Sequence, residues 1–323
     1  MLDKTQDEIM RGWGANSEIV VSIHCLAYNH EKFIQQSLDS FLSQETNFPF
    51  EVVVHDDAST DSTQKIIKEY EKKYPKIIVP IYETENQFGQ GTLNGIISKK
   101  IRGSFVAFCE GDDFWISSHK LQDQIDFLLA NRDYSGCVGA CLVLDDKTGI
   151  CRPREKKYPK FDLELNDFIG PTIGHTSTIV MRRSVYFELL SPEVPDVFSG
   201  DKVSLLLMRL NGKVAFLPKV FSVYRKSDVG ISRNVKYEYI KKDLQIPSWA
   251  KKRYERGNTK RYPYIKHLSY IYQTIFLFTK DLNWNNRMKY GLLFFFSSFA
   301  YFPRNIVRIL KITKAFVKGK KFT

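Results

Sequence analysis

Apolar runs alternate with amphipathic segments between residues 18 and 224 of this 323-residue chain. Runs rich in valine, isoleucine and phenylalanine predict strands, and segments with apolar residues three and four positions apart predict helices. The expected strands are 18–27, 51–55, 76–82, 104–109, 136–144, 176–181, 214–217 and 220–224, and the expected helices are 31–43, 62–73, 93–100, 120–129, 183–190 and 201–210. The alternation over residues 18–110 is typical of an α/β fold with a parallel, doubly wound sheet.

Two adjacent carboxylates, Asp112 and Asp113, follow the strand expected at 104–109. Open α/β sheets bind ligands at the carboxyl ends of their strands, which is where this pair falls. Two close carboxylates repel unless a cation or a bound hydroxyl lies between them. Mg²⁺ and Mn²⁺ suit oxygen ligands and usually arrive with a substrate diphosphate. A solvated Gly-Asp-Asp turn is the alternative interpretation.

A second polar cluster, residues 56–61, ends the strand expected at 51–55. Its short oxygen-bearing side chains are typical of a turn that caps the free N–H groups of a following helix. The cluster therefore predicts a helix start near Ser62.

The net charge of +12 is unevenly distributed. Residues 233–323 contain 21 Lys and Arg against 4 Asp and Glu, whereas residues 1–232 contain 27 against 32. This shift predicts a boundary near Gly230, with one domain over 1–232 and a basic region over 233–323.

Cysteine usage and hydropathy bear on the compartment. The five cysteines form no C-x-x-C pair and have no zinc-site spacing, which favours a reducing cytosolic compartment. Residues 1–17 are polar and lack the apolar core of a secretory signal. The longest strongly apolar run, 291–302, is shorter than the ~20 residues that a membrane-spanning helix needs.

The basic region contains two aromatic and apolar segments, 266–280 and 292–302, beside clusters of lysine and arginine. Such segments are typical of helices that lie on anionic lipid. The alternative is a helical subdomain that packs on the domain formed by residues 1–232. Nucleic-acid binding is not expected, because none of its named motifs is present.

Five stretches stand in the order of a known family: 20–29, 52–61, 105–113, 200–212 and 223–225. With them, residues 19–232 resemble an inverting glycosyltransferase of family 2. The resemblance implies the GT-A fold, a Rossmann-like and mostly parallel sheet flanked by helices, here followed by a basic helical extension. An unrelated Rossmann-like domain is the alternative, because each stretch alone is weakly specific.

The resemblance implies a nucleotide-sugar site made by Ala27, Tyr28, Asp57, Asn94 and Asp112. Tyr28 would stack near the base, and Asp57 would accept from a uracil-type N–H. Asp112 would face the ribose, and Asp113, with Asp112, would bind Mg²⁺ or Mn²⁺.

Asp201 matches the family's catalytic base, although Gly200 stands where a Glu usually precedes it. A direct displacement needs a carboxylate near the acceptor hydroxyl to take its proton. A helix N-cap is the alternative role for Asp201, because it opens an apolar-periodic helix.

Three further residues, Trp115, His175 and Arg225, are assigned by resemblance to the acceptor or diphosphate side. The motif after the last strand departs from the family, because Ser227 stands where a His is usual. Arg225 could still meet a diphosphate through charge-assisted hydrogen bonds.

The resemblance as a whole implies a metal-dependent inverting transfer from a UDP-sugar to a hydroxyl of a lipid-linked saccharide. The basic region suggests that the enzyme is cytoplasmic and peripheral on the inner face of a bacterial membrane. Two rivals are a nucleotidyltransferase and a non-catalytic basic membrane- or nucleic-acid-binding module. A nucleotidyltransferase would want a glycine-rich, lysine-bearing loop after the first strand, which residues 28–31 do not provide. The sugar, the linkage and the oligomeric state stay open.

Overall fold

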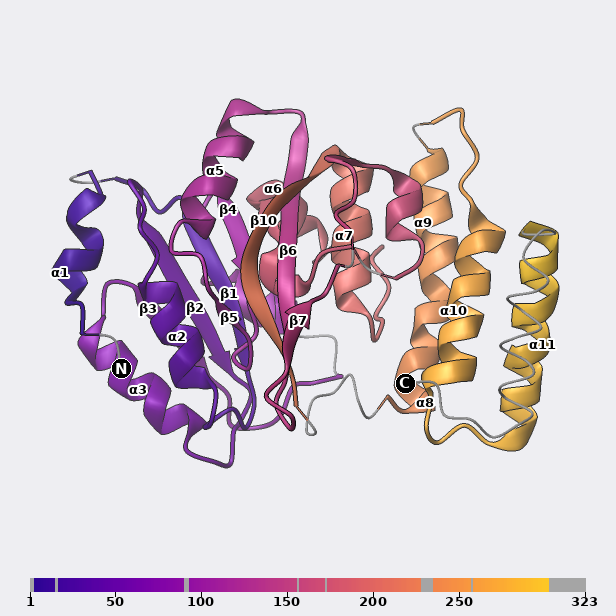
Figure 1. The fold of residues 1–323 in the computed structure, drawn as a ribbon, viewed down its shortest axis with the longest axis horizontal. Helices are drawn as coiled ribbons and strands as arrows, with labels where there is room; N and C mark the ends of the chain where they lie inside the picture. Colours follow the sequence, from indigo (N-terminus) through magenta and orange to yellow (C-terminus); the bar gives the residue numbers. More distant parts are fainter. Residues whose placement is uncertain are drawn as a thin grey trace. The chain divides into compact units, whose positions relative to one another are not determined.

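The computed structural model describes residues 3–14, 17–89, 93–155, 157–171, 173–227, 235–256 and 258–301 (Figure 1). The chain forms two compact units. The first unit comprises residues 1–164, 172–191 and 207–228, and the second comprises 165–171, 192–206 and 229–323. This division differs from the expected one, because the second unit also draws in two segments that precede residue 232.

The first unit is built on one sheet, whose strands are β1 (Val21–Ala27), β2 (Phe50–Asp56), β3 (Ile78–Tyr82), β4 (Phe105–Phe108), β5 (Phe114–Trp115), β6 (Tyr134–Asp145), β7 (Cys151–Pro153), β8 (Asp162–Leu163), β9 (Val180–Arg182) and β10 (Lys213–Lys226). Its helices are α1 (Gln6–Ile9), α2 (Ile34–Leu42), α3 (Thr63–Lys73), α4 (Leu93–Ser98), α5 (Lys120–Ala130) and α6 (Arg183–Glu188). Helix α7 (Gly200–Asn211) begins in the second unit and ends in the first.

The strand order is β3-β2-β1-β4-β9-β6-β10-β5, with β7 beside β6 and β8 beside β10. The longer pairings, β1 with β2 and β4, β2 with β3, and β6 with β10, are parallel, whereas the pairings of β5, β7, β8 and β9 are antiparallel. The order of the strands changes direction at β1: β2 and then β3 follow on one side of it, and β4 lies on the other side. The carboxyl ends of β1, β2 and β4 therefore meet at a topological switch point, the usual ligand site of such a sheet.

The sheet is covered on both faces, which explains why every residue of β2 is buried. Helices α2, α3 and α5 place apolar side chains such as Leu38, Ile67 and Ile125 into the main core of the unit. On the other face, Tyr186 of α6 packs against the rings of His24 and Phe108. These contacts hold the switch point on a rigid support.

Most of the predicted elements are confirmed, with differences where tertiary contacts decide. Residues 214–224 form the single strand β10, whose pairing with β6 shifts register near Val220. Thr176–Thr178 is a 3-10 turn, and the strand begins at Val180. Strands β7 and β8 lie in a segment expected as a loop, and two-residue β5 carries too little sequence pattern to be predicted.

The second unit is helical, as expected of the C-terminal extension. Its helices are α8 (Tyr237–Ile240), α9 (Ile246–Glu255), α10 (Tyr264–Phe278) and α11 (Trp284–Tyr301), and a 3-10 turn covers Lys241–Gln245. Ile271 and Ile275 of α10 share a core with Tyr290 of α11. Across the described ranges, no helix is long and apolar enough to cross a membrane.

Candidate functional site

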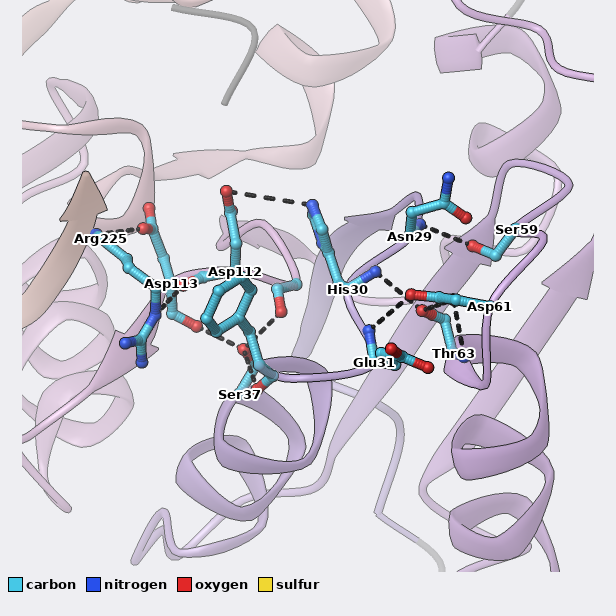
Figure 2. A network of polar contacts seen from close by, with 12 residues as sticks. Asn29, His30, Glu31, Ser37, Ser59, Asp61, Thr63, Asp112, Asp113 and Arg225 are labelled. Carbon is cyan, nitrogen blue, oxygen red and sulfur yellow. Dashed lines mark hydrogen bonds and ion pairs between the residues drawn. The ribbon is translucent and has the colours of Figure 1, made fainter. Parts of the chain in front are cut away.

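The turn that carries Asp112 and Asp113 joins β4 to β5 and is fixed by backbone hydrogen bonds. The Gly111 N–H donates to the Leu26 carbonyl of β1 at 2.7 Å. The Ser37 hydroxyl, in α2, lies 2.9 Å from the carbonyl oxygen of Gly111 and 2.5 Å from that of Asp113 (Figure 2). The two carboxylates are therefore held by an adjacent strand and a helix rather than by the local turn alone.

The position between Glu110 and Asp112 leaves little room for a side chain. A Cβ at Gly111 would lie 2.9 Å from the Ile34 side chain and 3.0 Å from Nδ1 of His30. Real Cβ contacts are rarely this short, so the close approach of the turn to α2 explains the glycine.

Arg225, from the carboxyl end of β10, clamps the same turn. Its N–H donates to Oδ1 of Asp113 at 2.8 Å, and its Nε donates to the Asp112 carbonyl at 3.0 Å (Figure 2). Its terminal nitrogens bond to Asp146 and Gln36, and the residue is only 8% exposed. These bonds join the Arg225 guanidinium to the carboxylate turn, and its expected diphosphate contact stays a prediction.

Asp113 is a buried carboxylate with one oxygen left over. Its Oδ1 accepts from Arg225, but its Oδ2 is buried without a hydrogen-bond donor among the described residues. Burial, with the charges of Asp112 and Glu110, raises the pKa of Asp113 well above its usual range. Such a group calls for a proton or a cation at Oδ2.

His175 lies beside Asp113 but does not supply that proton. Its Nδ1 is 3.4 Å from Asp113 Oδ2, yet it accepts from the Ser177 N–H and lies 2.9 Å from the Ser177 hydroxyl. Burial lowers the pKa of His175 to about 3, so the ring is neutral, and it stacks on Tyr224. Two acceptors therefore face each other across 3.4 Å, an arrangement that a cation between or beside them would stabilise.

The donor set fits a hard cation that is shared with a substrate. Asp112 is 21% exposed, and its Oδ2 lies 3.9 Å from Nε2 of His30. Among the described residues, no group of three His, Cys, Asp or Glu side chains forms a ready metal cage. Mg²⁺ and Mn²⁺ are commonly held by one or two carboxylates plus substrate phosphates, which is what Asp113 and Asp112 could offer.

Hydrogen bonds join the loops that follow β1 and β2 beside this turn (Figure 2). The Asn29 N–H donates to the Ser59 hydroxyl at 2.9 Å, and the Glu31 N–H donates to Asp61 at 3.0 Å. Asp61 also accepts from the Thr63 N–H, which confirms the predicted capping of the helix after the polar cluster. These reciprocal bonds make the edge of the sheet a single rigid rim.

Asp57 lies at the carboxyl end of β2, where its backbone N–H donates to the Ala27 carbonyl at 2.9 Å. Its carboxylate is buried and accepts from the N–H groups of Gln87 and Phe88, at 2.6 and 3.1 Å. Asp57 thus holds the loop after β3 against the carboxyl ends of β1 and β2.

Two exposed aromatic side chains border this part of the rim. Tyr28, directly after Ala27, is 45% exposed, and Phe88 is 40% exposed. The sequence pointed to Tyr28 but missed Phe88, which stands in a glycine-containing loop without periodicity. The available signal was an aromatic residue in a polar loop. Only the hydrogen bond from its backbone N–H to Asp57 shows that it lies beside that carboxylate.

Trp115, assigned by resemblance to the acceptor or diphosphate side, is a buried residue, and its contact with a ligand stays a prediction. The residue is 4% exposed, and its indole N–H donates to the Ser177 carbonyl at 2.9 Å. Its ring lies between Phe41 and the ammonium group of Lys120, at 4.8 and 4.1 Å. Lys120 is fully buried, and this burial lowers its pKa to about 7. Trp115 is therefore held by buried contacts within the main core of the first unit.

Asn94 and Asp201 are the two remaining site residues. Asn94 is in the first turn of α4, and its side chain lies outside the described residues. Asp201 is the second residue of α7 and belongs to the second unit.

Comparison with known proteins gives the class. Residues 22–190 match the family model described as glycosyl transferase family 2. Because the match covers more than half of the chain, the chain belongs to this family, and its fold is the GT-A fold expected from the sequence. This membership decides against the nucleotidyltransferase alternative.

Individual relatives agree with this class. The chain is 30% identical over 215 residues to an uncharacterised protein of Mycobacterium tuberculosis, a match over 65% of this chain and 60% of that protein. It is 27% identical over 221 residues, 68% of this chain and 84% of the relative, to a Bacillus subtilis protein named as a teichuronic acid biosynthesis glycosyltransferase, TuaG. The chain thus spans about 60% of the length of the first of these relatives.

Among solved structures, the Staphylococcus aureus TarS 1-349 fragment in complex with UDP superposes with a TM-score of 0.61. The two chains are 17% identical, and the superposition covers 94% of this chain and 93% of the other. A likeness at this level of identity shows the shared fold.

Proposed function

We propose that this protein transfers a sugar from a UDP-linked donor to a hydroxyl group of a saccharide acceptor, with inversion at the anomeric carbon. The carrying observation is the buried Asp113 carboxylate, whose Oδ2 has no hydrogen-bond donor in the described part of the chain, beside the more exposed Asp112 at the switch point of the sheet. A nucleoside diphosphate with a divalent cation supplies the charge that this pair lacks.

The donor base is proposed to lie on the aromatic side chains of Tyr28 and Phe88, with Asp57 accepting from its N–H edge. An ionised carboxylate has about four lone-pair positions, and the N–H groups of Gln87 and Phe88 use two of them. Acceptor capacity therefore remains for a uracil-type base. The UDP in the structurally similar TarS complex supports this choice of nucleotide.

The metal is proposed to be Mg²⁺ or Mn²⁺, held by Asp113 with Asp112. When bound, such an ion screens the diphosphate and stabilises the charge that it gains as it leaves. The chain's own contribution is to hold Asp113 in place through Arg225 and to keep water away from its inner oxygen.

Asp201 is proposed to be the general base that takes the proton of the acceptor hydroxyl as the new bond to the anomeric carbon forms. A single displacement with one base inverts the configuration at that carbon. The acceptor is proposed to be a lipid-linked saccharide of a surface polysaccharide, a proposal supported by the relative named for teichuronic acid biosynthesis.

A screen of nucleotide sugars tests this proposal. We expect a UDP-sugar to raise the unfolding temperature in the presence of Mn²⁺ or Mg²⁺, and to do so much less with EDTA, because a ligand that binds only the folded state stabilises it. At a ligand concentration of 100 times Kd the gain is about 2.7 kcal/mol. GDP- and ADP-sugars are the controls for the base. Equal shifts with all three bases would contradict the assignment of Asp57, and no shift with any nucleotide sugar would contradict the proposed function.

The second unit is proposed to rest on an anionic membrane surface through one face of α11. The exposed side chains of Trp284, Met288, Leu292 and Phe296 recur at four-residue spacing, so they form one stripe along the helix. Residues 302–323, which continue the chain from α11, contain seven Lys and Arg and no acidic residue. An apolar stripe beside a cationic segment matches an interfacial helix on anionic lipid.

Vesicle sedimentation tests the membrane proposal. We expect the protein to sediment with phosphatidylglycerol vesicles at low salt and much less at high salt, since surface charges are screened. Replacing Trp284, Leu292 and Phe296 by Gln should weaken binding by about 10²-fold or more, because shallow burial of each side chain contributes on the order of 1 kcal/mol. Leu129→Gln with Ile150→Gln, exposed apolar residues of the first unit, is the matched control. Equal recovery with phosphatidylcholine vesicles would contradict the membrane proposal. A stripe variant that changes the oligomeric state but still sediments with phosphatidylglycerol vesicles would contradict it as well.

A further inference from the structure

The segment that leads into α7 is held by one buried carboxylate, Asp243. Its Oδ1 accepts from the N–H groups of Phe198 and Ser199, at 2.9 and 3.0 Å. Its Oδ2 accepts from the Ser199 hydroxyl at 2.5 Å. Asp243 comes from the 3-10 turn Lys241–Gln245, which follows α8 in the second unit.

These bonds are strong for their setting. Asp243 is fully buried, and burial raises its pKa, while the hydrogen bonds from Ser199 and Phe198 and the charge of Lys202 act in the opposite direction. Burying a carboxylate costs free energy, which hydrogen bonds to its oxygens must offset. Charge-assisted hydrogen bonds are about twice as strong as neutral ones. The segment is therefore held in one conformation.

Fixing Ser199 fixes the first turn of α7. The Ser199 carbonyl accepts from the N–H groups of Lys202 and Val203, at 3.1 and 3.3 Å, so it starts the helical hydrogen-bond ladder. Asp201 lies inside that turn. By contrast, the neighbouring ion pair of Asp196 with Lys242 is exposed, and exposed pairs contribute little.

We propose that Asp243 is a positioning residue that sets the direction of the Asp201 side chain through Ser199. This inference rests on the proposed role of Asp201 as general base. It makes the segment after residue 229 part of the catalytic apparatus, in addition to its proposed membrane contact. Misplacing a reacting group by about 1 Å costs about 10²-fold in rate, so the effect of losing Asp243 should be large.

The test compares Asp243→Ala and Ser199→Ala with Asp196→Ala, measured at a temperature where circular dichroism shows every variant folded. We expect Asp243→Ala to lower kcat by about 10- to 100-fold, with the donor Kd unchanged by calorimetry. Ser199→Ala should lower kcat less, since two backbone N–H bonds remain, and Asp196→Ala should be unchanged. Asp243→Asn should recover part of the rate, because its amide oxygen still accepts from both N–H groups.

A double variant separates this inference from the proposed function. If Asp243 acts through Asp201, then Asp243→Ala should cause no further loss of kcat in an Asp201→Asn background. Loss that multiplies in that background, or normal kcat in Asp243→Ala alone, would overturn the positioning role and leave Asp201 as the base. Near-normal turnover of Asp201→Asn by itself would overturn the base assignment, and the inference would fall with it.

Discussion

Asp201→Asn is expected to lower turnover by about 10²-fold or more while leaving donor affinity nearly unchanged. The amide is almost the same size as the carboxylate and can still cap a helix, but it cannot take a proton from the acceptor hydroxyl. Donor affinity should persist, because the residues proposed to bind the nucleotide belong to the first unit, whereas Asp201 belongs to the second.

Steady-state kinetics with saturating donor, together with calorimetric titration of UDP, checks this expectation. Asp196→Asn is the matched control, because it also removes a charge from the segment of the second unit that precedes α7, at an exposed position. If Asp201→Asn turned over at close to the normal rate, another group would have to take the proton.

Asp113→Asn is expected to abolish metal-dependent donor binding and to stabilise the metal-free protein. The amide loses the charge that attracts a hard cation, so Mn²⁺ should no longer strengthen UDP binding. Its oxygen can keep accepting from the Arg225 N–H, while its NH₂ group can donate to Nδ1 of His175, which now faces a second acceptor at 3.4 Å. Relief of an unpaired buried acceptor is typically worth about 1–3 kcal/mol.

Thermal unfolding with EDTA and with Mn²⁺ plus UDP measures both effects. We expect a rise of a few degrees for Asp113→Asn in EDTA, since about 1 kcal/mol shifts the midpoint by roughly 2–4 °C in a domain of this size. The additional shift on adding Mn²⁺ and UDP should vanish. Asp133→Asn, at an exposed carboxylate paired with Lys213, is the control and should respond to metal like the wild type. A metal-dependent shift that survived in Asp113→Asn would remove Asp113 from the metal site.

The predictable part of the fold came from periodicity and from strand ends. Strand β2 and helix α5 were visible because Val52, Val53 and Val54 form an apolar run typical of a buried strand, and because an amphipathic helix repeats every three to four residues. Asp57 and the Asp112–Asp113 pair were visible because polar side chains directly after buried strands must lie at one edge of a parallel sheet. These inferences need no knowledge of long-range contacts.

The surroundings of Arg225, Trp115 and Phe88 could not be predicted, because they are made by contacts between distant parts of the chain. Arg225 is 112 residues from Asp113, and nothing local reveals that its backbone N–H donates to that carboxylate. Trp115 follows an acidic turn, which suggested substrate contact, but its ring is enclosed by Phe41 and Lys120. Phe88 gained significance only from its bond to Asp57.

The domain boundary shows the same division. The charge shift near residue 230 is a property of composition, and residues 229–323 fall in the second unit. The charge shift could not show that residues 192–206 also belong to that unit, because their attachment runs through Asp243, 44 positions beyond Ser199.

By itself, the sequence determined the family, the alternation of strands and helices, and the carboxylates at the ends of β2 and β4, because each of these is encoded in neighbouring residues. The tertiary structure decided how these side chains are paired: Oδ2 of Asp113 is buried with no hydrogen-bond donor among the residues that the structure describes, whereas the Arg225 guanidinium and the Trp115 indole N–H have partners. The physical reason is that hydrogen-bond partners and burial are settled by residues brought together from far along the chain, and no local pattern records them.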